Sequence, residues 1–528
     1  MSCALLVLVL IVVLLLFALR ERLLALWRQR RRIVACVDQL DGPFALPLLG
    51  SALAFKHDRV AFSYQMEEFA EKYASKTGMF RVWVGPKPAV CITRGDVAEA
   101  VLASTSELEK SFFMEAFRPW ISDGLLISKG QKWRDRRKVM MPTFHSSILR
   151  SFIEIYEEEA LVLLDVLNEQ HIGSGKTFDM FPYIKRMALD VICASAMGVK
   201  MNAQRDCAPE YVRAVLEMHE IMFTWQRTPW LWFDPIFYLL GYGFRRDRCL
   251  KTIFGVSKRV PVLEQHVEQH KLAKLEKLKN NNSEANGEQN RQVDKKKRVA
   301  FLDLLLEMAD EGKIDADGIR EEVETIMFAG RDTTAAGISW CLWYLGNCLD
   351  VQQKVHAELD SVFGDSDRAV TTDDLNKLAY LEMVVNEALR LCPSVPLLTR
   401  TLRADVRTTG GFTIPKGTIV IIGVPMVHRD PAQFPDPERF DPCRFLPENV
   451  AQRHPYSYIP FSAGARSCIG KKFAMLEEKT VLATILRRVR VQSMDTIENV
   501  RPLQEIITRP LHGFPVRFYA RRQMNSVK

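Results

Sequence analysis

Apolar residues recur at steps of three and four along much of the chain, the spacing that places them on one face of an α-helix. This pattern predicts helices over residues 151–170, 183–200, 208–226, 301–309, 319–349 and 472–489. Strand-like runs are few and short, and they cover residues 79–84, 88–92, 397–403, 418–424 and 514–519. The expected fold class is therefore mainly α with a minor β part.

The first apolar run differs from the others because no charge interrupts it between residues 3 and 19. As a helix it would span roughly 25 Å, enough for a thin bilayer. Arginines follow at 20, 22, 28 and 30–32, and basic residues stay on the cytoplasmic side. We expect residues 1–32 to form a single-pass transmembrane anchor. A cleaved secretory signal is the alternative, but no basic segment precedes the run and no small-x-small site ends it.

Segments of other composition divide the rest of the chain. Pro and Gly residues between 33 and 50 predict a linker, and 51–528 should form one large domain, because the motifs below must share a site. Residues 271–298 are rich in Asn, Glu and Lys. They cannot bury a core and predict a mobile surface loop.

Composition narrows the function classes. The chain has 528 residues and 11 cysteines without a C-x-x-C pair, which does not resemble a disulfide framework and favours a reducing compartment. The net charge of +8 suits a membrane surface, an acidic protein partner or nucleic acid. No zinc-finger, helix-turn-helix or RNA-binding pattern is present, so we expect no nucleic-acid partner.

One cysteine stands in an unusual setting, the stretch F-S-A-G-A-R-S-C-I-G from Phe461 to Gly470. A lone cysteine is usually a small buried hydrophobe. Here Gly464 and Gly470 bracket Cys468, which suits a backbone that turns closely under a flat cofactor. Arg466 can pair with a carboxylate, and backbone amides in the turn can hold a thiolate. The pattern F-x-x-G-x-R-x-C-x-G resembles the haem-binding loop of the cytochrome P-450 superfamily, whose cysteine thiolate ligates haem iron.

A second motif extends the resemblance. The string A-G-R-D-T-T from Ala329 to Thr334 matches the oxygen-activation motif of the family and falls within the long helix predicted over 319–349. Gly and Thr are poor helix formers, and Thr can bond back to the i−4 carbonyl and distort the helix. The resemblance implies that Thr333 hydrogen-bonds the oxygen being activated and that Asp332 relays protons.

A third motif is a charged pair in an apolar helix. Glu387 and Arg390 lie three residues apart and share a helix face, and their neighbours suggest burial, which is costly unless further hydrogen bonds complete the pair. The family completes it with a later arginine. Spacing to the cysteine loop favours Arg444, in P-C-R-F, although Arg439 stands in the literal family tetrapeptide P-E-R-F; both remain open.

Cationic residues suited to the two propionates of haem complete the match. Trp133 and Arg137 fit the family's W-x-x-x-R helix, Arg400 lies thirteen residues after Glu387, and Arg466 would be a further partner. The resemblance implies haem b, iron protoporphyrin IX, bound by these residues with Phe461 and Gly470.

Three stretches are most similar to family 4 of the superfamily, the fatty-acid ω-hydroxylase branch: residues 323–334, 428–442 and 466–480. That branch often has Glu at the position of Ala329, where it forms an ester to a haem methyl. Since Ala329 has no carboxylate, we predict non-covalent haem. Candidate pocket residues implied by the resemblance are largely apolar, as a lipid pocket requires: Phe113, Phe328, Ala329, Val395, Leu397, Leu398 and Ile507.

The implied reaction inserts one atom of O₂ into a C–H bond of a lipophilic substrate, with fatty-acid hydroxylation at or near the terminal carbon as the first choice. No G-x-G-x-x-G follows a strand, so electrons from NADPH require a separate NADPH–cytochrome P-450 reductase, with cytochrome b5 as a further donor. The reductase could dock on a basic face on the thiolate side, formed by Lys132, Arg134, Arg136, Lys138, Lys471 and Lys472. The expected location is the endoplasmic reticulum membrane, with the catalytic domain on the cytosolic side.

Three alternatives remain. A steroid or xenobiotic hydroxylase would share every motif. A haem-thiolate isomerase or a non-catalytic haem-binding protein would not need the Asp332–Thr333 pair.

Overall fold

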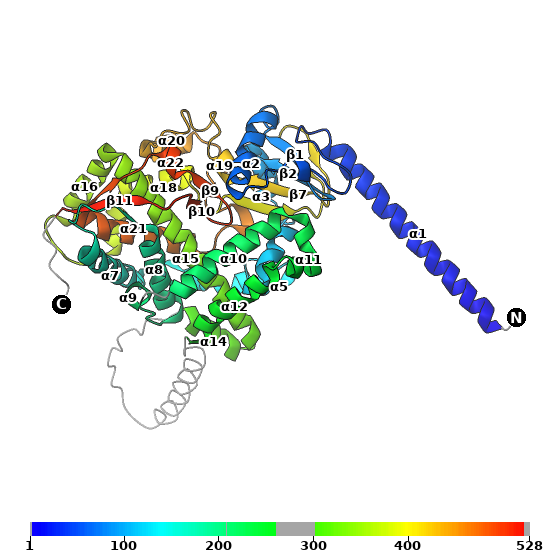
Figure 1. Cartoon of the computed structure of the whole chain (residues 1–528), viewed down its shortest axis with the longest axis horizontal. Coiled ribbons are helices and arrows are strands. Elements are labelled where there is room, and N and C mark those ends of the chain that lie inside the picture. Colours follow the sequence, from blue (N-terminus) through cyan, green and yellow to red (C-terminus); the bar gives the residue numbers. More distant parts are fainter. Residues whose placement is uncertain (1–2, 207–208, 260–300, 522–528) are drawn as a thin grey trace, which may run out of the picture.

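The computed structural model describes residues 3–206, 209–259 and 301–521, so the loop predicted over 271–298 lies outside the described residues. Helices dominate the described chain (Figure 1). The longer ones are α1 (Cys3–Val37), α2 (Arg59–Tyr73), α3 (Gly95–Leu102), α5 (Gly130–Met140), α7 (Ile153–Gln170), α8 (Phe181–Ile192), α10 (Pro209–Arg227), α12 (Tyr242–Arg259), α14 (Phe301–Asp310), α15 (Ala316–Asn347), α16 (Leu349–Phe363), α18 (Ala379–Leu391) and α21 (Lys471–Arg488). Shorter ones are α4 (Arg118–Ile121), α6 (Ser146–Arg150), α9 (Ala203–Asp206), α11 (Asp234–Leu239), α17 (Thr372–Lys377), α19 (Val424–Val427), α20 (Pro447–Ala451) and α22 (Ile497–Val500).

The strands are short and form small sheets, so the prediction of a mainly α protein with a minor β part is confirmed. They are β1 (Met79–Val84), β2 (Lys87–Ile92), β3 (Phe178–Asp179), β4 (Leu397–Thr401), β5 (Val406–Arg407), β6 (Thr413–Ile414), β7 (Ile419–Gly423), β8 (Val489–Ser493), β9 (Pro502–Gln504), β10 (Thr508–Pro510) and β11 (Pro515–Ala520). Each of the five predicted strands is found, with ends shifted by no more than a few residues.

The predicted helices are also found, with one notable difference. The periodic run 183–200 is not one α-helix: α8 ends at Ile192, a π-helical turn covers Cys193–Met197, and Gly198 ends it with φ of 71°. Apolar periodicity continues through the turn because its residues remain buried, whereas the change of winding leaves no mark in the pattern.

A four-stranded sheet lies at the end of the molecule from which α1 projects (Figure 1). Its order is β1-β2-β7-β4; β2 and β7 are parallel and the other pairs antiparallel. Side chains of successive residues point to opposite faces, so Val90 and Val420 pack in one apolar cluster while Ala89 and Ile419 pack in another. The sheet is therefore held between two apolar clusters, one on each face.

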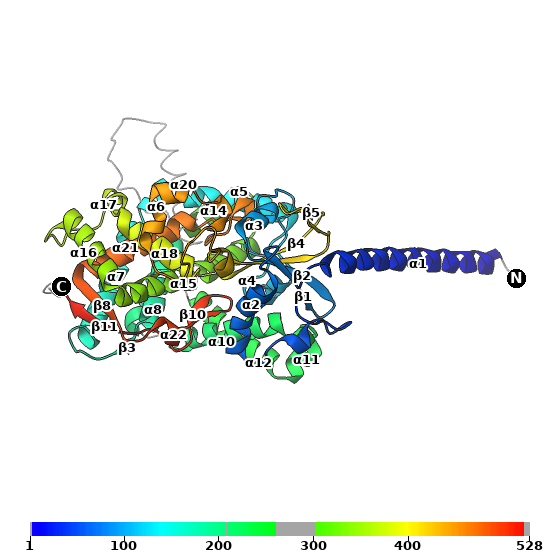
Figure 2. The same ribbon diagram turned by 90° about the horizontal axis from the view of Figure 1, so that it is seen from above.

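The central helix is α15, which runs through the middle of the helical part (Figure 2). It packs against α8, α18, α21 and β8, and from Glu322 onward most of its side chains are buried, including those of Trp340 and Trp343. A helix buried all round belongs to a core. Groups carried by α15 are therefore fixed in position by the packing of the whole domain.

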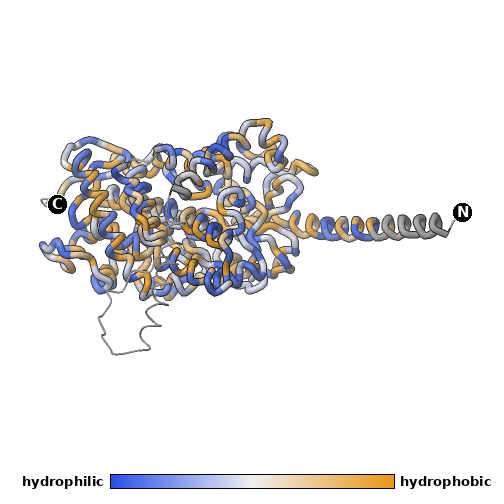
Figure 3. The backbone as a smooth tube through the Cα atoms, turned by 90° about the horizontal axis from the view of Figure 1, so that it is seen from below, coloured by the Kyte–Doolittle hydropathy of each residue, from blue (hydrophilic) through white to orange (hydrophobic). Residues whose placement is uncertain are grey.

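The N-terminal helix extends further than the anchor predicted over 1–32. It ends at Val37, and Ile33 and Val37 pack on the sheet beside Val90, while the rest of α1 projects away from the body (Figures 1 and 2). Beyond residue 16, α1 carries mixed hydrophobic and hydrophilic positions (Figure 3). The side chains of residues 3–16, which form most of the predicted membrane span, lie outside the described part of the chain. Among the described residues, no helix has both the length and the apolar character needed to cross a membrane.

Candidate functional site

The loop before α21 is shaped by glycines around Cys468. The Cys468 N–H donates to the Phe461 carbonyl at 2.8 Å and the Ser467 N–H donates to that of Gly464 at 3.0 Å. Gly464 has φ of 69°, and a Cβ there would overlap the carbonyl oxygen of Leu102. Only glycine fits this left-handed, crowded position, and so the loop can turn tightly and present the sulfur.

The Cys468 thiol opens into an interior cavity of about 250 Å³. The thiol is exposed only to this cavity and is otherwise surrounded by protein, and this burial raises its pKa. The Gly470 N–H and the positive charges of Arg137, Lys110 and Lys471 lower the pKa and so oppose the rise. A sulfur with such partners can be held as thiolate by a Lewis-acidic metal.

The walls of this cavity come from distant parts of the chain. Phe461, Arg466 and Gly470 lie on the side of Cys468, whereas Ala329, Gly330 and Thr333 come from α15 and Val395 and Leu398 from the region of β4. A Cβ at Gly330 would lie 2.7 Å from Ile192 of α8. The absence of a side chain at Gly330 thus lets α15 pack closely on α8 beside the cavity.

A cluster of basic side chains lies at one edge of the cavity, with Arg400 and Arg466 buried and Lys110 half-buried. Lys110 and Arg466 line it, and Arg400 is 2% exposed and close enough to affect both. Burial lowers the pKa of Arg400 to about 10, and burial followed by the neighbouring Arg400 and Arg137 lowers that of Arg466 to about 9. Arg466 donates to the carbonyls of Leu108 (2.9 Å), Leu125 and Ser128.

In the described part of the chain, no ion pair with a carboxylate involves Lys110, Arg400 or Arg466. Buried charges without counter-charges are costly. The edge of the cavity is therefore suited to a group that carries more than one negative charge.

Trp133 and Arg137, on α5, lie just outside this cavity. The Arg466 guanidinium stacks 4.1 Å from the centroid of the Trp133 ring. Arg137 donates to the Ser467 carbonyl at 2.9 Å. Both residues thus hold the cysteine loop and Arg466, and neither lines the cavity itself.

The two threonines of α15 bond back to the preceding turn. Thr333 Oγ1 donates to the Ala329 carbonyl and Thr334 Oγ1 to that of Gly330, both at 2.7 Å. The helix nevertheless remains continuous from Ala316 to Asn347. Thr333 lines the cavity over Cys468, so its hydroxyl lies at the wall that faces the thiol.

Asp332 lies in a separate polar niche. Arg331 donates to both of its carboxylate oxygens, at 3.1 and 2.8 Å, and Lys185 and His219 lie 3.5 and 3.6 Å away. Burial would raise the pKa of Asp332, but Arg331, Lys185 and His219 together lower it below its usual range. This carboxylate is therefore ionised and held by cations, on a small cavity that it shares with Glu505.

The third motif forms the buried cluster that its sequence suggested. Glu387 and Arg390 are both 0% exposed and joined by two hydrogen bonds of 2.7 and 2.8 Å. Arg444 completes it as an ion pair, with Nε 3.4 Å from Glu387 Oε1. Arg439 contributes only its backbone carbonyl, which accepts from Arg390 at 3.2 Å. The structure thus places the Arg444 side chain, and not that of Arg439, at Glu387.

A second cavity, of about 230 Å³, adjoins the first and shares Lys110, Leu126, Ala329, Thr333, Val395 and Leu398 with it. All seven candidate pocket residues line it: Phe113, Phe328, Ala329, Val395, Leu397, Leu398 and Ile507. It extends between α2, α10 and the four-stranded sheet, through Phe62, Phe223 and Val84. Together the two cavities form a mainly apolar space that ends at Cys468.

Comparison with known proteins identifies the family. A family model described as cytochrome P450 matches residues 40–514. The chain belongs to the cytochrome P450 family. Cytochrome P450 4V2 of Mus musculus is 41% identical over 500 residues, which cover 94% of this chain and 91% of the relative. Cytochrome P450 4c3 of Drosophila melanogaster is 39% identical over 496 residues, with the same coverage. The predicted membership, including the likeness to family 4, is confirmed, and the enzyme is a P450 monooxygenase.

Haem is the cofactor of this family, and the residues present fit it. The cavity offers a thiol on one wall for the iron and, at its edge, the basic side chains of Lys110, Arg400 and Arg466 for two propionates. Lys110, one of these cations, was not found by the sequence reasoning. It lies in irregular chain without a periodic or motif signal, and only the fold brings it to Arg400 and Arg466.

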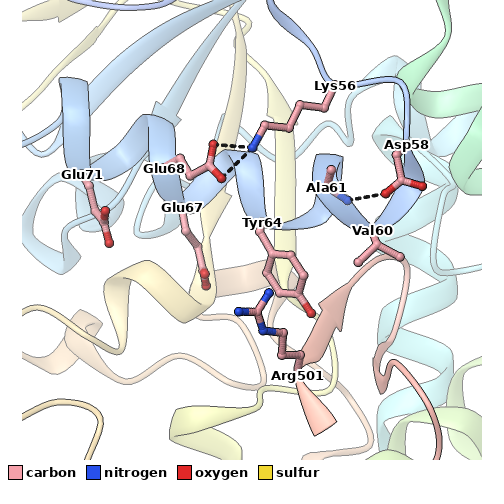
Figure 4. Close-up of a pocket in the computed structure, with 9 residues that line it drawn as sticks. All are labelled: Lys56, Asp58, Val60, Ala61, Tyr64, Glu67, Glu68, Glu71 and Arg501. Carbon is pink, nitrogen blue, oxygen red and sulfur yellow. Dashed lines mark hydrogen bonds and ion pairs between the residues drawn. The ribbon is translucent and has the colours of Figure 1, made fainter. Parts of the chain in front are cut away.

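A hollow of about 520 Å³ on the outer face of α2 is unrelated to this site. Figure 4 shows its carboxylates, Glu67, Glu68 and Glu71, with Lys56 paired to Glu68 and Arg501 beside Tyr64. None of its lining residues lines the cavity over Cys468. Only the opposite face of α2, through Phe62 and Met66, reaches the second cavity.

Proposed function

We propose that this P450 hydroxylates fatty acids at or near the terminal carbon. The observation that carries the proposal is the continuous apolar space from Thr333 and Cys468 outward between α2, α10 and the sheet. Such a space suits haem at the Cys468 end and an extended hydrocarbon whose end reaches the Thr333 wall, where the two cavities meet. The similarity to family 4 relatives supports the same substrate class.

In this proposal Cys468 binds the haem iron, and Lys110, Arg400 and Arg466 pair with the propionates. Arg137 and Trp133 position the cysteine loop and Arg466. A separate buried cluster with a structural role is formed by Glu387, Arg390 and Arg444. Bound haem supplies the activation of O₂, from which one atom enters a C–H bond and the other leaves as water. The haem is held without a covalent bond, because Ala329 provides no carboxylate.

Thr333 and Asp332 take different parts in handling protons. Thr333 carries a hydroxyl at the cavity wall, where it can orient a proton donor towards the site of O₂ activation. Asp332 relays protons when it releases Arg331 and Lys185, because these cations lower the pKa of its carboxyl below the usual range.

Electrons reach the site from NADPH through NADPH–cytochrome P450 reductase, with cytochrome b5 as a further donor. The docking face that we propose is the basic thiolate side, where Arg134 and Lys138 border an open hollow beside Arg137. Lys132 is already paired with Asp123 and Glu321, so it contributes less free charge to such a face.

The location that we propose is the endoplasmic reticulum membrane, with residues 1–32 as anchor and the catalytic domain on the cytosolic side. Exposed apolar side chains from two segments support contact with lipid, and Pro229 and Leu48, which both adjoin Gly85, bring these segments together. These side chains are Leu48, Leu49, Leu53, Trp230, Phe233, Leu239, Leu240 and Phe244.

The test is incubation of the full chain with reductase, NADPH and a mixed panel of fatty acids, sterols and xenobiotics, with products identified by mass spectrometry. Fatty acids hydroxylated at or near the terminal carbon would support the proposal. Turnover of a sterol or xenobiotic with no fatty-acid product would overturn the substrate assignment.

Thr333→Val should uncouple NADPH consumption from product formation.

A further inference from the structure

The second cavity contains one arginine that no carboxylate neutralises in the described part of the chain. Arg227, the last residue of α10, lines the portion that is not shared with the cavity over Cys468. One of its terminal nitrogens donates to the His57 carbonyl at 2.9 Å. Its Nε is buried and has no hydrogen-bond partner among the described residues. An unsatisfied buried donor on a charged group is costly, so this geometry favours a ligand that accepts from it.

Glu505, a carboxylate that could neutralise Arg227, forms ion pairs with two other arginines instead. Glu505 also lines this cavity, but it pairs with Arg59 at 3.1 Å and with Arg509 at 2.8 Å. Arg59 also pairs with Glu220 at 3.4 Å, so Arg59 and Arg509 have two carboxylate partners, and Arg227 adds a positive charge that pairs with neither. Burial lowers the pKa of Arg227, while Tyr242, Glu505 and Asp58 raise it and Arg59 lowers it. This end of the cavity therefore has an excess of positive charge.

The rest of the wall has little polar character. Phe62, Met66, Phe223 and Leu397 are among the residues that continue it towards Thr333, and the neighbouring Gln226 amide already donates to the Phe113 carbonyl at 3.0 Å. A ligand that complements this space has a long hydrocarbon and a single anionic head.

We propose that Arg227 binds the substrate's carboxylate and directs the hydrocarbon towards the Thr333 wall of the cavity over Cys468. This inference rests on the proposed function and adds the subsite that orients the fatty acid. With the head held at α10, the methyl end is the part that reaches Ala329 and Thr333, where the second cavity meets the haem-binding cavity. The same contact thus accounts for oxidation near the terminal carbon.

The test compares palmitate with methyl palmitate on the haem-loaded full chain, with Kd measured from the spectral change on binding. Arg227→Met should weaken palmitate roughly 10- to 100-fold, the range for a hydrogen-bonded charged pair. Methyl palmitate, which lacks the charge, should bind as it does to the wild type. Arg227→Lys should fall between the two, and Arg213→Gln, an exposed arginine on the same helix, should match the wild type.

Loss of orientation gives an independent readout, because the products of Arg227→Met should spread away from the terminal carbon. Unchanged palmitate affinity in Arg227→Met, or an equal loss for acid and ester, would overturn the inference and leave the fatty-acid function standing. A wild-type enzyme that neither binds nor hydroxylates palmitate would instead overturn the function and the inference together.

Discussion

The buried carboxyl of Glu478, on α21, should make the stability of the folded protein depend on pH. Its side chain is 2% exposed and lines the cavity over Cys468, and its Oε2 has no hydrogen-bond partner in the described chain. A Cβ at Gly337 would overlap its Oε1, so α15 packs directly on the carboxyl. Burial raises the pKa of Glu478 from 4.5 to about 8. The folded protein therefore retains a proton that the unfolded chain releases.

The sign of the pH effect follows from the bound proton. Between pH 4.5 and about 8 the folded state binds more protons than the unfolded state, so stability falls as pH rises. The rise in the pKa of Glu478 from 4.5 to about 8 corresponds to a loss of at most about 5 kcal/mol in unfolding free energy across this pH range. Glu478→Gln keeps the shape but cannot ionise, so its advantage in unfolding free energy over the wild type should grow across this range and level off above it.

Urea unfolding of the haem-loaded wild type and variant, followed by circular dichroism from about pH 5 to about pH 9, measures this difference, and contributions shared by both proteins cancel. Glu169→Gln, an exposed glutamate at the end of α7, controls for removal of a charge and should show no such trend. A difference between Glu478→Gln and wild type that stays constant with pH would refute the reasoning.

Three further predictions concern the loop, the buried cluster and the haem. Gly464→Ala should abolish haem incorporation, measured by the Soret absorbance, whereas Gly173→Ala, which also has positive φ but faces open space, should keep its haem. Arg390→Met leaves the fully buried Glu387 without its bidentate partner and should cost roughly 3–5 kcal/mol in urea unfolding; a loss below about 1 kcal/mol would contradict the assigned role. The wild type should release all of its haem on denaturing acid extraction, and Ala329→Glu should retain part of it covalently.

Features that depend on a few neighbouring residues could be predicted from the sequence. The glycines, arginine and cysteine between 461 and 470 lie within one turn of chain, so their spacing alone indicates the loop. The long helices could likewise be predicted because their apolar faces repeat over many residues. The seven pocket candidates came from the family resemblance, and all of them line one cavity.

Features that depend on the direction of side chains across the fold were decided only by the tertiary structure. Asp332 and Thr333 are adjacent in the chain, yet the turn of α15 places one in a polar niche and the other at the cavity. Spacing left Arg444 and Arg439 open, whereas packing brings only the Arg444 side chain to Glu387.

The partners of the expected cofactor illustrate the same limit. Lys110 carries no sequence signal. It joins Arg400 and Arg466 only because the loop that precedes a short 3₁₀-helix at residues 112–117 packs beside β4 and the cysteine loop. Local sequence fixes which groups are available and which helices carry them. Long-range packing fixes where each group points, because burial and charge compensation are properties of the assembled core and not of any one segment.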